Sequence, residues 1–306
     1  MIDETRPRGV LAPVVTPFDE TLAPDAGRLV EHCRWLLAND VGLAVFGTNS
    51  EANSLATGEK LELLEGLVDA GIDPARMMPG TGCCAITDSV ALTKRAVELG
   101  CAGVLMLPPF YYKDVSDEGL YRNFAEIIDR VGDNALRIYL YHIPPVSRVP
   151  ISLELIERLL TDFPGTIAGV KDSSGDWDNT RAMIERFGPR GFDVFAGSET
   201  FLLDTLRAGG VGCISATANV NPGPIARLAA TWRQGDADDQ QAALDVIRRI
   251  FSRYVMIPTL KAAIARYGSD PGWERVRPPL VELAAEEREA LFAALDDAGF
   301  DMPGLS

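Results

Sequence analysis

One lysine stands out as the residue best suited to carry chemistry. Only five of the 29 basic residues are lysines, and Lys171 lies near the end of the apolar stretch IAGVKD (167–172). A buried ammonium ion without a partner is costly, so such a group responds by losing its proton. A neutral amine can attack a ketone and form an imine. Lys171 is therefore a candidate nucleophile. Alternatively, it forms an ion pair with Asp172 or Glu199, or its side chain extends to solvent.

Hydroxyl groups follow two other apolar stretches. Tyr141 lies in RIYLYHIP (137–144), and Thr48 ends GLAVFGT (42–48). A phenol that is hydrogen-bonded to another hydroxyl can move a proton. Alternatively, Tyr141 is an ordinary amphipathic tyrosine that buries its ring and leaves its hydroxyl in contact with water. Thr48 opens the turn TNSEANS (48–54), whose successive N–H groups could hold a carboxylate or could form ordinary Asx and Ser turns.

The elements that must position these residues alternate along the chain. Short, β-branched apolar runs bounded by Gly or Pro predict strands, and amphipathic stretches between them predict helices. The sequence predicts caps at Ser116, Ser152 and Asp176. Continuous apolar strands are typical of parallel sheets buried on both faces. The eight predicted strands lie at 10–18, 42–48, 77–82, 103–109, 137–144, 167–172, 192–199 and 212–217.

Eight strand–helix units predict an α/β fold, a (βα)8 TIM barrel, over residues 1–234. A doubly wound sheet is the alternative, but no G-x-G-x-x-G follows the first strand. Residues 235–306 are predicted to form a C-terminal helical extension that packs on the barrel. In a parallel barrel the active site lies at the carboxyl ends of the strands, where Lys171, Tyr141 and Thr48 all fall.

Composition and charge exclude several function classes. The chain of 306 residues is 47% hydrophobic and 24% charged, which is ordinary for a globular protein. Its net charge of −15 disfavours binding to nucleic acid and to anionic membranes. The sequence shows no secretory signal core and no apolar run long enough to span a membrane. Five cysteines without C-x-x-C spacing favour a reducing, cytoplasmic location.

Metal and nucleophile motifs of other enzyme classes are missing. The two histidines, His32 and His142, cannot supply a histidine-rich zinc site. His32 falls inside a predicted helix, where a structural role is expected. No acidic cluster at the strand ends points to Mg²⁺, and there is no P-loop or Ser/His/Asp set. We therefore expect neither a metal nor a cofactor.

Six ordered motifs resemble the dihydrodipicolinate synthase / N-acetylneuraminate lyase family of class I, Schiff-base pyruvate aldolases. The resemblance covers nearly the whole chain. The motifs are APVVTPF (12–18), GTNSE (47–51), PFYYKD (109–114), YHIP (141–144), GVKD (169–172) and GCISATAN (212–219).

The resemblance implies a role for each matching residue. Lys171 would form the Schiff base, Tyr141 would move protons, and Thr48 would link Tyr141 to Tyr112, which the family places in a neighbouring subunit's site. Thr48 and Asn49 would bind the substrate carboxylate. The residues implied to face the rest of the substrate are Ser173, Gly197, Ser198, Glu199 and, through its carbonyl, Ile214. A homotetramer, a dimer of dimers, is also implied.

Departures from the family pattern separate its branches. The synthase branch carries an arginine where this chain has Val146, and Arg148 lies two residues later. That spacing corresponds to about 7 Å along an extended chain, so Arg148 cannot simply substitute. His142 replaces the usual asparagine; it either hydrogen-bonds the neighbouring backbone or tunes Tyr141. Ala216 stands where sialic acid lyases tend to carry a hydroxyl.

The resulting hypothesis is a lyase or aldolase whose substrates are a 2-oxo acid, pyruvate, and an aldehyde. Within this class we expect a 2-keto-3-deoxy sugar acid aldolase. A dihydrodipicolinate synthase (4-hydroxy-tetrahydrodipicolinate synthase) or a 2-keto-3-deoxy acid dehydratase is the alternative in chemistry. A catalytically silent binding barrel is the alternative outside enzymes.

Overall fold

The computed structural model describes residues 6–305, and its strands and helices alternate as the sequence predicts. Seven strands and a parallel bridge between Gly80 and Leu105 fall in the eight predicted runs of this part of the chain. A helix follows each of them, so the alternation is confirmed. No helix of the described residues is long and apolar enough to cross a membrane. Backbone contacts gather the chain into two compact units.

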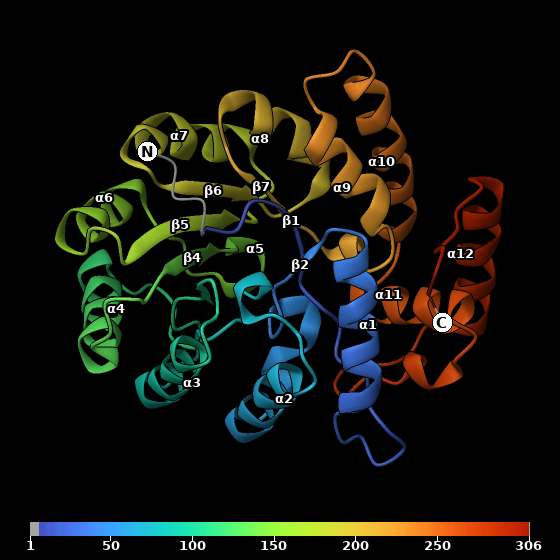
Figure 1. The fold of residues 1–306 in the computed structure, drawn as a ribbon, viewed down its shortest axis with the longest axis horizontal. Coiled ribbons are helices and arrows are strands. Elements are labelled where there is room, and N and C mark those ends of the chain that lie inside the picture. Colours follow the sequence, from blue (N-terminus) through green and yellow to red (C-terminus); the bar gives the residue numbers. More distant parts are fainter. Residues whose placement is uncertain (1–5, 306) are drawn as a thin grey trace. The chain divides into compact units, whose positions relative to one another are not determined.

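The first unit comprises Asp73–Ile214 and the described residues before Gly9. Its strands are parallel and run in the order β3-β4-β5-β6-β7, with the Gly80 segment beside β3. Figure 1 shows β4, β5 and β6 side by side. The strands are β3 (Val104–Met106), β4 (Ile138–His142), β5 (Ile167–Asp172), β6 (Asp193–Ala196) and β7 (Gly212–Ile214).

Three helices of this unit begin at the caps that the sequence predicts. Ser116, Ser152 and Asp176 each accept a hydrogen bond from a backbone N–H of the first helical turn, which satisfies one donor that the helix itself leaves open. The helices are η3 (Pro74–Arg76), α3 (Ile86–Glu98), α4 (Asp117–Val131), α5 (Pro144–Ser147), α6 (Leu153–Asp162), α7 (Trp177–Phe187), η4 (Gly188–Arg190), η5 (Glu199–Phe201) and α8 (Leu202–Ala208).

The second unit comprises Gly9–Ile72 and the described residues from Ser215 onward, and its strands β1 (Gly9–Ala12) and β2 (Gly42–Leu43) pair in parallel. Its N-terminal helices are α1 (Ala26–Ala38), η1 (Thr48–Ser50), η2 (Ala52–Ser54) and α2 (Thr57–Asp69). Its C-terminal helices are η6 (Ala216–Asn219), α9 (Pro222–Thr231), α10 (Ala237–Phe251), α11 (Met256–Tyr267), η7 (Pro271–Glu274) and α12 (Ala285–Asp297).

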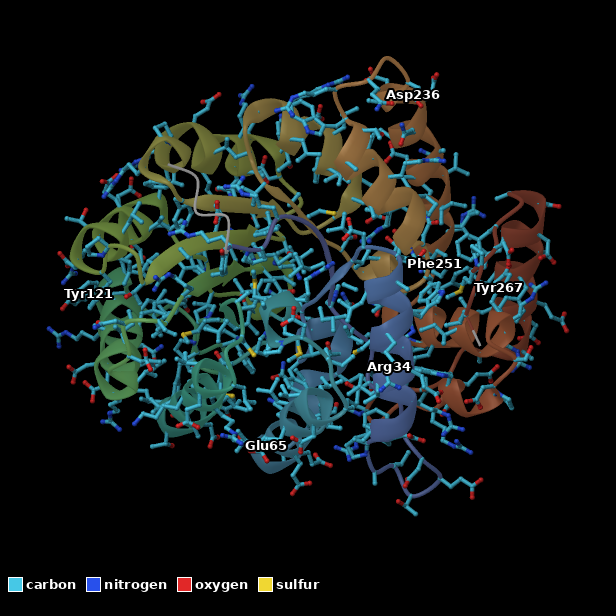
Figure 2. All side chains as sticks on the ribbon, viewed as in Figure 1. Arg34, Glu65, Tyr121, Asp236, Phe251 and Tyr267 are labelled. Carbon is cyan, nitrogen blue, oxygen red and sulfur yellow. The ribbon has the colours of Figure 1, made fainter. Side chains whose placement is uncertain are left out.

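The C-terminal part beyond residue 236 is helical, as predicted, and has a small aromatic core of its own. Phe251 of α10 and Tyr267 of α11, both labelled in Figure 2, pack edge-on against Phe300. In addition, α10 contacts α9, and α11 contacts η1 and η6. The predicted boundary at residue 234 separates the alternating strands and helices of the barrel from the helical extension, and this boundary stays a prediction.

Candidate active site

Lys171 and Tyr141 lie opposite each other on neighbouring strands. Parallel pairing places Tyr141 of β4 beside Lys171 of β5, and Phe195 of β6 lies on the other side of the lysine. Opposed residues of adjacent strands project from the same face of a sheet. Lys171 Nζ accordingly donates a hydrogen bond to Tyr141 Oη at 3.2 Å and lies 4.2 Å from the centroid of that ring. Each of the two residues is only 2% exposed.

The predicted alternative of an ion pair between Lys171 and Asp172 is not found. Asp172 projects from the opposite face of β5, where its carboxylate accepts hydrogen bonds from Ser174, Asn179 and Thr180 at the start of α7. No salt bridge of Lys171 occurs among residues 6–305. The lysine is thus buried beside a phenol, and Asp172 holds the following helix.

The layer of side chains toward the amino ends of the strands supports this pair. Here Tyr139 lies opposite Gly169, and Gly169 lies opposite Asp193. A Cβ atom on Gly169 would come within 2.8 Å of the Tyr139 ring, so glycine leaves the space that the ring fills. The ring packs edge-on against Phe195, which places it next to the layer of Lys171. Sequence reasoning missed this layer because it contains no residue at a strand end.

Asp193 is the charged member of that layer. Its carboxylate accepts from Tyr139 Oη at 3.3 Å and from Arg6 and Arg8 at 3.4 and 3.5 Å. Burial raises the pKa of Asp193, while the two arginines act to lower it. Burial and the Asp193 charge raise the pKa of the Tyr139 phenol. Tyr139 therefore stays protonated, and its role is to pack and to donate.

The predicted substrate-facing residues of the first unit cluster beyond the ends of β5 and β6. The parallel ladder continues past the strands, because the Ser173 N–H donates to His142 O and the Gly197 N–H donates to Asp172 O, both at 2.7 Å. A Cβ on Gly197 would come within 2.7 Å of Ser173 Cα. Ser198 caps η5 through Thr200 N, and Glu199 is buried. Ile214, the last residue of β7, is buried as well.

His142 hydrogen-bonds the backbone, the first of the two predicted possibilities. Its Nδ1 accepts from the Ile151 N–H at 3.0 Å, so the ring proton lies on Nε2. Burial lowers the pKa of His142, against the raising effect of Asp172. The ring therefore fixes the chain between β4 and α6 on the face of β4 opposite to Tyr141.

The Tyr112 side chain is largely exposed in its own unit. It is 74% exposed and packs edge-on against Tyr111, which is 75% exposed. Lys113 holds their loop through hydrogen bonds to the carbonyls of Phe110 and Ser147. Val146, 62% exposed, and Arg148, in the left-handed region at φ 53°, lie on the neighbouring turn.

Thr48 and Asn49 belong to the second unit, where they form the half-buried turn η1. Their approach to Tyr141 stays a prediction. The turn is held on one side by Ser50, whose Oγ accepts from the Gly47 N–H at 3.1 Å and whose carbonyl accepts from Thr16 Oγ1 at 2.7 Å.

Asn219, the last residue of the motif GCISATAN, joins several segments of the second unit. Its amide nitrogen donates to Pro13 O and Ala216 O, and its oxygen accepts from the Val15 N–H at 3.0 Å. His32 lies 3.4 Å from the same oxygen. The asparagine side chain thus fixes the segment after β1. The sequence showed Asn219 only as the last residue of a motif and gave no indication of this structural role.

The side chains that could bind a metal ion in this protein are those of His, Cys, Asp and Glu. Among the described residues no group of three or more His, Cys, Asp or Glu side chains is arranged to hold a metal ion. The five cysteines are all free thiols. The chemistry on offer is that of a buried amine and a phenol.

Comparison with solved structures defines the class of protein. The structure superposes with a TM-score of 0.87 on dihydrodipicolinate synthase from Agrobacterium tumefaciens, at 31% identity over 95% of this chain and 99% of the other. It matches YagE from E. coli K12, solved in complex with pyruvate, with the same TM-score at 26% identity over 96% and 99% of the two chains. The fold is thus the predicted (βα)8 barrel with C-terminal helices, and the protein is a class I lyase.

Sequence comparison identifies the family. The model of the dihydrodipicolinate synthetase family matches residues 6–298, and the chain belongs to this family. An uncharacterised DapA-like lyase of Chloroflexus aurantiacus is 34% identical over 95% of this chain and 96% of its own. The 4-hydroxy-tetrahydrodipicolinate synthase of Methanococcoides burtonii is 32% identical over 95% and 98%.

Proposed function

We propose that this chain forms an imine between Lys171 and a 2-oxo acid and acts as a 2-keto-3-deoxy sugar acid aldolase. The observation that carries the proposal is the buried pair of Lys171 Nζ and Tyr141 Oη, 3.2 Å apart. The Lys171 side chain is buried, and its amine lies beside a phenol and makes no salt bridge with a carboxylate of the described residues. The complex of YagE with pyruvate, a family member, agrees with a 2-oxo acid as substrate.

The reaction needs one nucleophile and one group that moves protons. The Lys171 amine adds to the keto carbon of the substrate, and the resulting carbinolamine loses water to give the iminium ion. The hydroxyl on the β-carbon then loses its proton, and the bond between the α- and β-carbons breaks. The electrons of that bond form the enamine with the iminium group, and the β-carbon leaves as the carbonyl carbon of an aldehyde. Protonation of the enamine and addition of water release pyruvate and restore the amine. We assign the proton transfers of these steps to Tyr141, whose Oη lies 3.2 Å from Lys171 Nζ.

Substrate recognition is assigned to residues at the strand ends. Thr48 and Asn49 of η1 would hold the substrate carboxylate, and Ser173, Gly197, Ser198, Glu199 and Ile214 would face the remainder of the substrate. Tyr112 would complete the site of a neighbouring subunit, which its 74% exposure permits. A homotetramer is proposed because the family resemblance implies one.

A second candidate is 4-hydroxy-tetrahydrodipicolinate synthase, because several relatives near 30% identity carry that name. Val146 argues against it. An arginine at this position would grip the carboxylate of the second substrate in the synthase branch, whereas Arg148 lies two residues further on, beyond the end of α5. A valine offers no charge to that carboxylate.

Imine trapping tests the proposal. The protein is incubated with pyruvate and sodium borohydride, digested and analysed by mass spectrometry. The adduct is expected on Lys171 and on no other lysine; Lys261 is an internal control because it is equally buried but is paired with Glu51. Lys171→Ala should lose the adduct and turnover while remaining folded. Tyr141→Phe should lower turnover by about 10²- to 10⁴-fold, the usual contribution of a proton-transfer group.

The substrate assignment is tested by incubating the protein with a panel of 2-keto-3-deoxy acids and measuring released pyruvate. An adduct on Lys171 together with condensation of pyruvate and an amino semialdehyde would establish the synthase instead. The absence of any adduct on the wild-type protein would refute imine chemistry and leave a silent barrel.

A further inference from the structure

A buried ion pair lies directly beside the turn assigned to the substrate carboxylate. Glu51 follows η1 in sequence and Lys261 lies in α11, and both side chains are 0% exposed. Lys261 Nζ donates to Glu51 Oε1, and the backbone N–H of Arg277 donates to Glu51 Oε2 at 3.0 Å. Both carboxylate oxygens of Glu51 are therefore held by residues more than 200 positions away in the sequence.

The surroundings of Lys261 fix it in place. Its ammonium group also donates to Arg275 O at 2.7 Å and lies 4.4 Å from the centroid of the buried Phe18 ring. Burial lowers the pKa of Lys261 to about 8, against the raising effect of Glu51. The amine thus stays largely protonated at neutral pH, which charge pairing with Glu51 requires.

The backbone at Glu51 is constrained as well. Its φ of 55° and ψ of 32° place a non-glycine residue in the left-handed region, which costs roughly 1 kcal/mol or more. This residue lies between η1 and η2, as the C-cap of the first and the N-cap of the second, so it sets the direction in which the chain leaves Thr48 and Asn49. The backbone hydrogen bonds of Glu51 with Thr48 and Ser54, together with the contacts of its side chain, hold it there against that cost.

Stability alone does not account for a charged pair in this position. A buried ion pair can often be replaced by apolar side chains without loss of stability, since desolvation offsets the attraction. Its value here is geometric: Ser50 holds one end of the turn to Gly47 and Thr16, and Glu51 holds the other end to α11 and to the segment after η7.

We propose that Glu51 and Lys261 are positioning residues that keep the Thr48–Asn49 turn in the shape that receives the substrate carboxylate. The proposal rests on the proposed function and deepens it, because it makes the C-terminal helix α11 part of substrate recognition. The two residues act through the turn and do not touch the substrate.

The test measures the pyruvate concentration that gives half-maximal borohydride-trapped adduct on Lys171. The variants are Glu51→Gln, which keeps size and one acceptor, and Lys261→Met. Glu59→Gln is the matched control: Glu59 pairs with the guanidinium of Arg277 in the same region but does not adjoin the turn. If a single variant fails to fold by circular dichroism, the double variant Glu51→Gln/Lys261→Met, which leaves no unpaired charge, replaces it.

A positioning role predicts that half-saturation rises about tenfold or more in Glu51→Gln and Lys261→Met, as loss of a charged hydrogen bond would cause, while the adduct plateau is unchanged. Glu59→Gln should stay within about twofold of wild type, whatever its stability. Half-saturation in folded Glu51→Gln equal to wild type, or an equal rise in Glu59→Gln, would overturn the proposal. A wild-type protein that gives no adduct at all would overturn the proposed function itself, which is a distinct result.

Discussion

His32 offers a pH-dependent test of the structure that requires no substrate. The ring lies inside α1, with centroids 5.6 Å from the ring of Trp35 and 5.2 Å from that of Trp273. Its Nε2 lies 3.4 Å from Asn219 Oδ1. That oxygen also accepts from the Val15 N–H, so Nε2 carries the proton, and Nδ1 has no hydrogen-bond partner among the described residues. The structure thus holds a neutral imidazole.

Burial lowers the pKa of His32 from 6.5 to about 4, while the hydrogen bond to Asn219 acts in the opposite direction. Between these two values the unfolded chain binds more protons than the folded one, so the free energy of unfolding falls as the pH falls from 6.5 to 4. The folded and unfolded pKa values of His32 differ by 2.5, and a difference of one in pKa corresponds to about 1.36 kcal/mol. The loss of unfolding free energy is therefore at most about 3.4 kcal/mol. Above pH 7 the contribution is constant.

The assay compares urea unfolding of wild type and His32→Gln at several pH values from 4 to 7. Glutamine keeps an N–H donor for Asn219 but does not titrate, and the difference between the two proteins removes the shared contribution of the carboxylates. On going from pH 7 to pH 4 we expect the stability difference to move by about 3 kcal/mol in favour of the variant.

The histidine titration can also be followed directly. The chain has two histidines, so NMR of ¹³C-labelled histidine gives two ring signals that His142→Asn would assign. A His32 ring that titrates at 6.5 or above, or a stability difference that does not change with pH, would refute the burial argument.

Two further substitutions test the site. Tyr112→Phe should lower turnover in the assembled protein, with Tyr111→Phe as the equally exposed control; unchanged turnover, or a fully active monomer in size-exclusion chromatography, would contradict the role assigned to Tyr112. Gly197→Ala should cost about 1–3 kcal/mol of stability and slow imine trapping, because its Cβ would come within 2.7 Å of Ser173 Cα. Gly66→Ala in α2, where a Cβ meets nothing within 4 Å, should instead stabilise by about 1 kcal/mol in urea unfolding; equal effects of the two glycine substitutions would show that the crowding at Gly197 is unimportant.

Much of the fold was predictable because its signals are local. The apolar runs and the caps at Ser116, Ser152 and Asp176 depend on residues within one or two turns of each other, so the sequence shows them directly. The burial of Lys171 could be predicted for the same reason, since its strand is apolar on both sides of the lysine.

Other features of the site could not be predicted in this way. Asp172 follows Lys171 in sequence yet serves α7, because successive strand residues face opposite sides of the sheet. The contact of Tyr139 with Gly169 depends on the register between β4 and β5, which neither strand encodes alone.

The sequence by itself determined the alternation of strands and helices, the helix starts and the identity of a buried lysine, since each follows from the hydrophobicity and hydrogen bonding of neighbouring residues. Only the tertiary structure decided which groups that lysine meets and what holds the turn at Thr48. Lys171 meets Tyr141 through strand pairing, and Glu51 meets Lys261 across 210 residues. Contacts between residues so far apart in the sequence depend on the tertiary packing of all the strands and helices, which no local segment encodes.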